Sequence, residues 1–331
     1  MRAPAYELTR CIVCGSTDSS EVAAHEEIQS EIELLWAFHG KRLRPSTPPE
    51  RLADRLAFSE HPPWRVVECA ECGFVFRNPI ERERDVLASY ADEAPPPEAL
   101  HSLHDVQRDA YRVQARRVFR ALGRRGTGLE VGSYAGAFLS AARAVGLAFE
   151  GVDVNPHVNA FARTLGFVVH DGTLETLAFD RTYDAIAIWN CFDQLPDPRR
   201  AVRAAWKLLA PGGVLALRVP NGEFYARARA VLSRGGWRHG LARAMLAHNN
   251  LLSFPYRYGF TPRSIARLLG NGGFDVWRII GDVLVPVADE WTWGWAALEE
   301  RVVKRVWRVV SRWSLRMAPW IEVYARRCRA S

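Results

Sequence analysis

The chain has 331 residues, of which 48% are hydrophobic and 24% are charged. This balance is ordinary for a globular protein, and the length is enough for one large domain and a smaller one. No stretch approaches the roughly 20 apolar residues of a membrane-spanning helix, and the first residues lack the apolar run of a signal peptide. We therefore expect a cytoplasmic protein, in which free thiols and metal-bound thiolates outlast disulfides.

The formal net charge of +7 is unevenly distributed along the chain. From Trp291 to the C-terminus there are nine Lys or Arg against three Glu, an excess of six positive charges. Because almost the whole imbalance lies in this one segment, the sequence does not indicate a distributed phosphate-binding surface. The charge pattern thus argues against nucleic acid as a partner.

Four of the six cysteines form two pairs with the same spacing. Cys11 and Cys14 are followed by a glycine, and so are Cys69 and Cys72. Two thiolates two residues apart can bind one metal ion from a single tight turn, where glycine allows a positive φ that points backbone N–H groups at the sulfurs. Two such turns complete a tetrahedral shell of four sulfurs, which favours zinc. We predict a structural Zn²⁺ site in a zinc ribbon over residues 1–90, with two unrelated redox pairs as the alternative.

The two cysteine pairs are farther apart than a minimal ribbon requires, with 54 residues between Cys14 and Cys69. Apolar residues at helical spacing predict a helical insert around Glu26–His39. After the second pair, residues 91–104 are rich in proline and glutamate, and we expect this segment to be a linker.

Residues 105–331 show short apolar runs that alternate with helical stretches. Helices are predicted around Asp105–Leu122, Phe138–Val145 and Asn159–Leu165. Strands that alternate with helices pair in parallel, so the pattern predicts an α/β fold with a doubly wound sheet. The strand candidates are Leu129–Val131, Phe149–Val152, Val168–His170, Ala185–Trp189 and Val214–Val219.

The clearest functional signal follows the first of these strands, in the sequence LEVGSYAGAF. The strand ends in Glu130, and Gly132 and Gly136 would let the backbone approach a ligand closely at the carboxyl end of the strand. Asp153 closes the next strand, 21 residues after Gly132. At about this offset an acidic residue accepts hydrogen bonds from ribose hydroxyls, so the two features together predict a nucleotide site. Pro156 then suits the first turn of a helix.

This loop resembles that of the class I S-adenosylmethionine (SAM)-dependent methyltransferase family, and the resemblance covers roughly residues 105–331. The family's loop has an acidic residue and three alternating glycines. Glu130, Gly132 and Gly136 match, whereas Tyr134 stands at the middle glycine position. The resemblance implies a Rossmann-like fold with a seven-stranded, mostly parallel sheet.

Two further blocks carry the same resemblance. The sequence LLAPGGVLALRVPNG at Leu208–Gly222 looks very like the family's turn and fifth strand. The cysteine motifs, with CGFVFRNP after the second pair, recur in bacterial methyltransferases that have an N-terminal zinc-binding segment. Several of those enzymes act on sugars or cell-surface glycan precursors.

By this resemblance the cofactor is SAM. Asp153 would hold the ribose, Asp171 and Gly172 would lie beside the adenine, and Trp189 and Asn190 would end the fourth strand near the methionine part. The residues implied to bind SAM are Glu130, Gly132, Ser133, Tyr134, Gly136, Asp153, Val154, Asp171, Gly172, Trp189 and Asn190.

Methyl transfer from a sulfonium is an in-line displacement, and an O- or N-acceptor can also need a base within hydrogen-bond reach. Many family members have histidine where Gln194 stands, and glutamine is no base. Asp193 is expected to cap a helix or face solvent. His248 is the best candidate, in an aromatic-rich insertion over residues 223–270; a hydrogen-bonded structural histidine is the plainer interpretation. The further candidates for an acceptor pocket are Asn249, Asn250, Tyr256 and Tyr258.

The C-terminal part is predicted to complete the sheet. The sequence GFTPRSIARLL indicates a capped helix, Phe274–Ile280 a sixth strand and Pro319–Ala325 an antiparallel seventh. Residues 291–318 are predicted to form a basic, Trp-rich amphipathic helix between these two strands. The apolar residues assigned to one face of this helix are Leu298, Val302, Val306, Val310, Trp313 and Met317.

Two interpretations of the basic helix stay open. It can pack on the sheet with a solvated basic face, or it can lie on an anionic membrane surface as a peripheral contact. The basic residues are Arg301, Lys304, Arg305, Arg308, Arg312 and Arg316.

We therefore predict SAM-dependent methyl transfer to a small-molecule acceptor: a saccharide, a lipid-linked glycan precursor or a secondary metabolite. An RNA methyltransferase that docks nucleic acid with its zinc ribbon is one alternative. The sequence lacks the Asp/Asn-Pro-Pro-aromatic motif typical of enzymes that methylate exocyclic base nitrogens. An inactive SAM-binding scaffold module is the other alternative.

Overall fold

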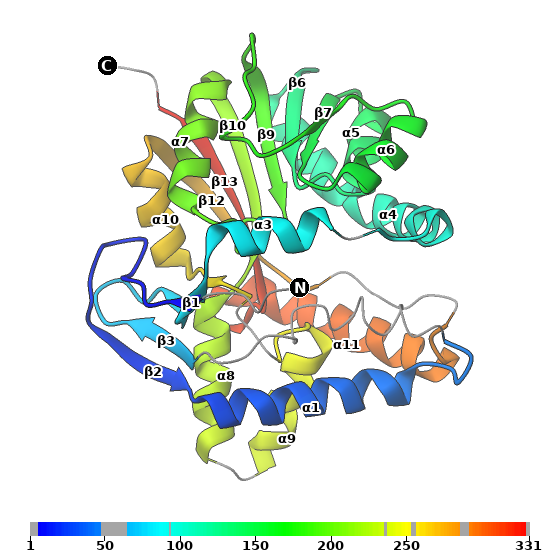
Figure 1. Ribbon diagram of the computed structural model, residues 1–331. Coiled ribbons are helices and arrows are strands. Elements are labelled where there is room, and N and C mark those ends of the chain that lie inside the picture. The colour runs from blue at the N-terminus through cyan, green and yellow to red at the C-terminus, as the bar shows by residue number, and fades with distance from the viewer. Residues whose placement is uncertain are drawn as a thin grey trace.

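The computed structural model describes residues 6–47, 65–92, 94–234, 237–252, 256–284 and 291–328. Its upper half in Figure 1 is an α/β sandwich built on a seven-stranded sheet, and its lower half is a layer of helices that includes α1, α8, α9 and α11. Helix α3 lies between the two halves in this view. The predicted fold class is confirmed.

The sheet has the strand order β12, β13, β10, β9, β6, β7, β8. Neighbours from β10 to β8 pair in parallel, whereas β13 is antiparallel to both β10 and β12. This is the predicted doubly wound sheet with an antiparallel last strand. The strands are β6 (Thr127–Val131), β7 (Ala148–Asp153), β8 (Val169–Asp171), β9 (Tyr183–Trp189), β10 (Leu209–Pro220), β12 (Phe274–Asp282) and β13 (Trp320–Arg327).

Helices cover both faces of this sheet. The central strand β9 is buried on both sides: Ala185 and Ala187 pack with residues of α4 and α5, and Ile186 and Ile188 pack in the core that includes residues of α7 and α10. A parallel strand covered on both faces reads as such a continuous apolar run. The flanking helices are α4 (Pro97–Leu122), α5 (Ala137–Ala144), α6 (Pro156–Thr164), α7 (Pro198–Leu208) and α10 (Pro262–Asn271).

Helix α4 begins earlier than the sequence indicated. It starts at Pro97, inside the segment 91–104 that was predicted to be a linker. Proline fits the first turn of a helix, because its fixed φ suits that position and its missing N–H would have no partner there. The Pro-rich run therefore starts a helix instead of separating two domains.

The N-terminal region forms small antiparallel sheets. One has the order β11, β4, β3, β2, and it takes β11 from the insertion after the fifth strand of the large sheet. Phe74 and Phe76 of this region lie in the same hydrophobic core as Ile186 of β9. The ribbon thus packs directly on the large domain. Its strands are β1 (Tyr6–Glu7), β2 (Ser19–Ala23), β3 (Arg65–Cys69), β4 (Val75–Asn78), β5 (Ile80–Glu81) and β11 (Tyr258–Gly259).

Ion pairs link the helices of the lower layer. Arg229 of α8 pairs with Glu31 of α1, and Arg42 of α1 pairs with Glu299 of α11 at 2.6 Å. The predicted helical insert is α1. The helices outside the sandwich are α1 (His25–Arg42), α3 (Glu83–Ala91), α8 (Gly222–Arg234), α9 (Trp237–His248) and α11 (Gly294–Trp313), and a 3₁₀ turn at Leu315–Met317 leads into β13.

Helix α11 does not turn its apolar face toward the sheet, as the plainer of the two interpretations expected. Ala296, Glu300, Lys304 and Ser311 are its buried residues, whereas Leu298, Val302, Val306 and Trp313 of the predicted apolar face are exposed and Val310 is half-buried. The prediction that the apolar face packs on the sheet is therefore wrong. Glu300 and Lys304 pair with each other, which lets a polar face turn inward.

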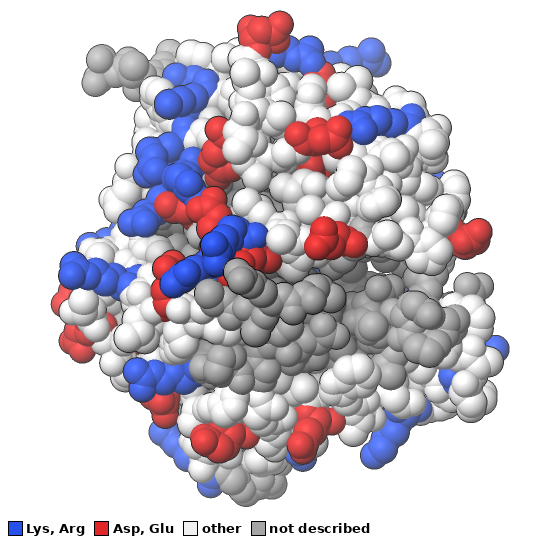
Figure 2. Space-filling model, viewed as in Figure 1, with Lys and Arg blue, Asp and Glu red and all other residues white. Residues whose placement is uncertain are grey.

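The described residues show neither a broad one-signed charge patch on the face in Figure 2 nor a helix suited to crossing a membrane. On the face shown in Figure 2, Lys and Arg lie among Asp and Glu, without a broad patch of one sign. None of the helices in the described ranges is long and apolar enough to cross a bilayer.

Candidate active site

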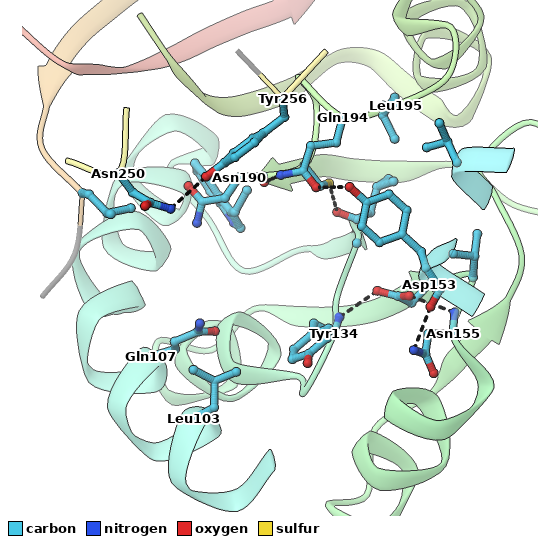
Figure 3. Close-up of a pocket in the computed structure, with 18 of the residues that line it drawn as sticks. Leu103, Gln107, Tyr134, Asp153, Asn155, Asn190, Gln194, Leu195, Asn250 and Tyr256 are labelled. Carbon is cyan, nitrogen blue, oxygen red and sulfur yellow. Dashed lines mark hydrogen bonds between the residues drawn. The ribbon is translucent and has the colours of Figure 1, made fainter. Parts of the chain in front are cut away.

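A cavity of about 600 Å³ lies at the carboxyl ends of the parallel strands. Its lining includes loops after β6, β7, β8 and β9 and residues of α1, α9 and α11. In Figure 3, Asp153 and Tyr134 lie on one side of it, and Asn250 and Tyr256 lie on the other. Open α/β sheets bind ligands at this edge, and the volume is typical of a small-molecule site.

The loop after β6 brings backbone close to this cavity. Gly132 has φ 70°, and a Cβ at this position would lie 2.6 Å from Sγ of Cys191, so only glycine fits without a shift. Tyr134 also has a positive φ, of 43°. Its N–H donates a hydrogen bond of 3.0 Å to Oδ2 of Asp153. This bond holds the tight turn although a tyrosine replaces glycine there.

Asp153 ends β7 and lines the cavity. Its Oδ1 accepts a hydrogen bond of 3.0 Å from the N–H of Asn155. Burial raises the pKa of Asp153, and the N–H groups of Asn155 and Tyr134 act in the opposite direction. A carboxylate has about four lone-pair sites, so Asp153 can still accept hydrogen bonds from a ligand.

Glu130 lies buried at the end of β6. Burial, together with the nearby Asp153, raises its pKa well above the ordinary value. Its Oε2 is buried and has no hydrogen-bond partner among the described residues. A buried carboxyl without a partner is costly and favours a nearby cation or donor.

Asn190 follows β9 and has a left-handed backbone with φ 59°, a conformation that asparagine tolerates well. Its Oδ1 accepts from Nη1 of Arg218 at 3.0 Å, and its Nδ2 donates to Oη of Tyr111 at 3.1 Å. Arg218 is fully buried and pairs with Asp282 at 3.1 Å. These contacts hold the side chain of Asn190 in place in the cavity wall.

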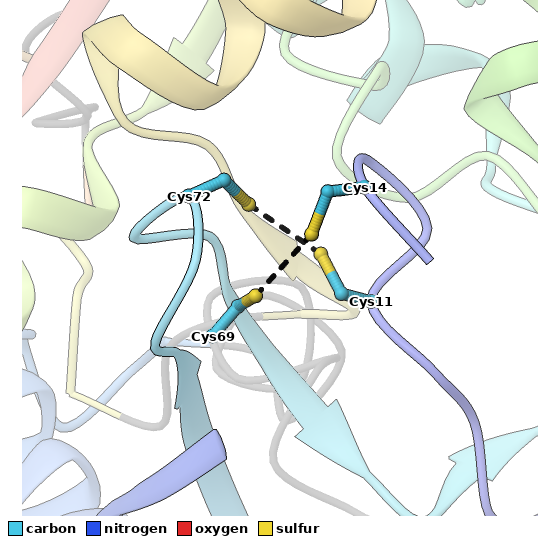
Figure 4. Close-up of side chains that lie close together, drawn as sticks. All are labelled: Cys11, Cys14, Cys69 and Cys72. Atoms are coloured by element: carbon cyan, nitrogen blue, oxygen red, sulfur yellow. Dashed lines mark hydrogen bonds between the residues drawn. The ribbon is translucent and has the colours of Figure 1, made fainter. Parts of the chain in front are cut away.

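The four paired cysteines lie together (Figure 4), and none of them lines the cavity. Their sulfur atoms all lie within 4.8 Å of one another, and Cys11–Cys72 and Cys14–Cys69 each approach to 3.5 Å. The close approaches therefore join one motif to the other. Backbone N–H groups next to each motif donate to sulfurs, as the sequence predicted, and burial raises the pKa of Cys72 to about 11. Four convergent sulfurs are compatible with a zinc site.

A family model described as a methyltransferase domain matches residues 103–279, more than half of the chain. The chain belongs to this family of class I SAM-dependent methyltransferases. No curated protein matches the chain.

Several solved structures of methyltransferases show a distant similarity to the chain. A SAM-dependent methyltransferase of Mesorhizobium loti is 16% identical with a TM-score of 0.45, over 65% of this chain and 96% of that chain. A possible histamine N-methyltransferase of Thermotoga maritima is 17% identical with a TM-score of 0.41, over 66% and 90%. The plantazolicin methyltransferase BamL, in complex with a substrate analogue and SAH, is 13% identical with a TM-score of 0.44, over 92% and 100%. At these identities the likeness is one of fold alone.

The methyltransferase places most of the predicted cofactor residues at the cavity. Those that line it are Gly132, Tyr134, Asp153, Val154, Gly172, Trp189 and Asn190. Glu130, Ser133, Gly136 and Asp171 are not among the lining residues. Gly136 caps α5, and the half-exposed Asp171 pairs with Arg163 at 2.7 Å.

The residues at this end of the cavity fit SAM. Asp153 has free acceptor capacity for ribose hydroxyls, and Gly132 leaves room for a close ligand.

His248, the predicted base, also lines the cavity. Nε2 of His248 lies 3.4 Å from Glu299, whose other carboxylate oxygen pairs with Arg42. Burial, followed by the charge of Arg42, lowers the pKa of His248, and Glu299 opposes this effect. The imidazole is therefore neutral at neutral pH and able to accept a proton. Phe38 packs edge-on against it, with ring centroids 5.0 Å apart.

Of the four other predicted acceptor residues, two line the cavity and two do not. Asn250 and Tyr256 line the cavity, and Nδ2 of Asn250 donates to Oη of Tyr256 at 3.0 Å. Asn249 and Tyr258 are not lining residues. The amide of Asn249 bonds to backbone of the surrounding loops, and Tyr258 donates to a backbone carbonyl at 3.0 Å.

Asp193 corrects another expectation. It neither caps a helix nor faces solvent, because it is fully buried and neither carboxylate oxygen has a hydrogen-bond partner among the described residues. Burial raises its pKa well above the ordinary value. Asp193 is not among the residues that line the cavity, and its raised pKa favours the protonated form.

Sequence reasoning missed the contributions of the N-terminal helices. Oη of Tyr90 in α3 donates to Oε1 of Gln194 at 2.8 Å, and its carbonyl accepts from Asn155 at 2.9 Å. Gln194, which cannot act as a base, thus has a structural partner at the cavity. Val86 and Tyr90, which lie four residues apart, both line the cavity, and this helical spacing was the available signal.

Proposed function

We propose that this methyltransferase transfers the methyl group of SAM to a small-molecule acceptor, such as a sugar, a glycan precursor or a secondary metabolite. One observation carries the proposal: the cavity lined by Asp153 is also lined by residues of α1, α9 and α11, so the predicted cofactor residues share one cavity with a second set of aromatic and polar side chains. A space of about 600 Å³ between two layers suits a small acceptor better than a polymer.

His248 is the proposed catalytic base. SAM supplies an electrophilic methyl group on a sulfonium, and the protein positions the acceptor and receives its proton. The neutral imidazole of His248 takes that proton from an acceptor hydroxyl or amine, and Glu299 stabilises the resulting cation from 3.4 Å. Asn250 and Tyr256 offer polar contacts to the acceptor.

The proposed metal is a structural Zn²⁺ held by Cys11, Cys14, Cys69 and Cys72. All four sulfurs converge and no fifth ligand position is needed, so the ion would hold the two turns together and take no part in catalysis. Thiolate ligands remain reduced in the cytoplasm, which is the compartment that we propose.

Turnover on fractionated cell extract tests the proposed function. The protein is incubated with methyl-labelled SAM and three fractions: small molecules, total RNA and protein. We expect label in the small-molecule fraction. Transfer to RNA alone would overturn the acceptor class, and transfer to no fraction by SAM-binding protein would favour the scaffold alternative.

His248→Asn separates catalysis from cofactor binding in the same assay. Asparagine keeps a polar side chain but cannot act as a base, so turnover should fall about 100-fold, within the range for general-base catalysis. The affinity for SAM should stay unchanged, because His248 is not among the residues predicted to hold the cofactor. Unchanged turnover would leave His248 with a structural role only.

A further inference from the structure

The outer face of α11 is an apolar stripe that the rest of the molecule leaves exposed. Trp313 is 85% exposed, and the other members are each more than half exposed. They recur at intervals of three or four residues, so they lie along one side of the helix over about 27 Å. The stripe consists of Trp295, Leu298, Val302, Val306, Val309 and Trp313.

Such a stripe is unusual for the surface of a globular protein. Single exposed apolar residues are common, but a contiguous apolar patch marks a contact with another surface. The inner face of α11 is already committed to the protein: Glu300 lines the cavity, Lys304 pairs with Glu300, and Glu299 pairs with Arg42. Rotation of the helix to bury the stripe would expose Glu300 and Lys304 and would break the ion pair between Glu299 and Arg42.

The charges beside the stripe indicate what covers it. Arg301, Arg305, Arg308 and Arg312 are exposed, and their spacing places them along one flank. Within the described ranges, Arg301, Arg305 and Arg312 form no ion pair with an acidic residue. A second copy of this chain would bring this positive flank near another positive flank. An anionic partner is favoured instead.

We propose that α11 docks this stripe on an anionic membrane surface. The helix lies in the plane of the interface, with the apolar stripe among the lipid chains and the arginine flank on the acidic headgroups. Trp293, Trp295 and Trp313 have the amphipathic side chains that prefer this boundary. Anionic lipids of the cytoplasmic leaflet supply the complementary charge.

Flotation of the full chain with vesicles tests the proposal. We expect the protein to float with vesicles of phosphatidylcholine and phosphatidylglycerol and to remain unbound with phosphatidylcholine alone. Binding should weaken as salt is raised, because the arginine contacts are screened. No flotation with the anionic vesicles, or equal flotation with both, would overturn the proposal.

Matched variants test whether vesicle binding depends on the stripe itself or on any exposed side chain of the same type. Val302→Glu places a charge in the stripe and should lower vesicle partition at least tenfold. Val113→Glu on α4 alters a valine of similar exposure outside the stripe and should leave partition unchanged. Arg305→Glu should lower partition at least fivefold, against no change for Arg116→Glu on α4. Equal losses in a stripe variant and its α4 control would contradict the assignment.

The molar mass in solution distinguishes a protein partner from a membrane. We expect the same monomeric mass for wild type and Val302→Glu in light scattering without vesicles. A dimer that Val302→Glu converts to a monomer would identify the stripe as a contact between copies and overturn the membrane assignment.

Discussion

Asp153 and His248 line the same cavity, and burial shifts the pKa of each toward the neutral form. The backbone N–H groups on Asp153 counter this shift and favour a carboxylate that can accept ligand hydrogen bonds. For His248, burial and Arg42 favour the neutral imidazole, which is the form that a base requires. The two residues are thus adapted to different parts of a methyl transfer.

The pKa of His248 should be measurably below its ordinary value of 6.5. Glu299→Gln removes an anion that stabilises the protonated ring, so it should lower the pKa of His248 further. NMR titration of the imidazole signals, assigned with His248→Asn, measures both. The unfolded chain takes up this proton first as the pH falls. The stabilising contribution of His248 is therefore present above about pH 6.5 and lost below it. A pKa at or above 6.5 would contradict the buried, neutral ring.

Gly132→Ala should weaken SAM binding at least tenfold. The added Cβ would lie 2.6 Å from Sγ of Cys191, and the positive φ costs an alanine roughly 1–2 kcal/mol. Gly270→Ala is the matched control, because its Cβ would meet nothing within 4 Å in α10. Calorimetric titration with SAM compares the two, and equal affinities would show that the loop does not need glycine there.

At the scale of elements, the ribbon, α1 and α3 are attached to the large domain through shared structure. β11 joins the small sheet, Tyr90 of α3 bonds to Gln194, and Arg42 of α1 bonds to Glu299. Residues of α1 and α3 then line the cavity. Loss of the ribbon should therefore alter the site and not merely remove an appendage.

Cys72→Ser should remove bound zinc and destabilise the whole protein. The four sulfurs join two turns that are far apart in sequence, so the metal contributes folding free energy directly. Cys328→Ser is the control, because this exposed cysteine lies outside the cluster. Metal analysis should find one zinc per chain in the control and none in Cys72→Ser, whose melting temperature should fall. The zinc assignment would be contradicted if the wild type contained no zinc, or if removal of its zinc left the melting temperature unchanged.

For the whole molecule, local signals in the sequence were enough to predict the sheet. The apolar runs, the capped helix after Thr261 and the antiparallel last strand are all present in the structure. Gly132 and Asp153 were predicted from their spacing, and both line the cavity. These features depend on residues close in the chain or on strands whose order the fold class sets.

Features that depend on contacts between distant segments were not predictable in this way. Nothing in the sequence near α1 indicates that Arg42 reaches Glu299, 257 residues away. The inward polar face of α11 likewise depends on the packing of Glu300 and Lys304 against other parts of the chain, which reverses the usual amphipathic rule. In both cases the observed arrangement depends on tertiary contacts that the local sequence does not indicate.

The central claim is that Asp153 and the loop beside it hold SAM, and calorimetric titration of wild type and Asp153→Ala with SAM tests it most directly. We predict binding by wild type and a loss of affinity of about 10- to 100-fold in Asp153→Ala, as expected when hydrogen bonds to a charged group are removed. Asp153→Asn, which keeps one acceptor oxygen, should be intermediate. Absence of SAM binding by wild type, or equal affinity in Asp153→Ala, would contradict the account.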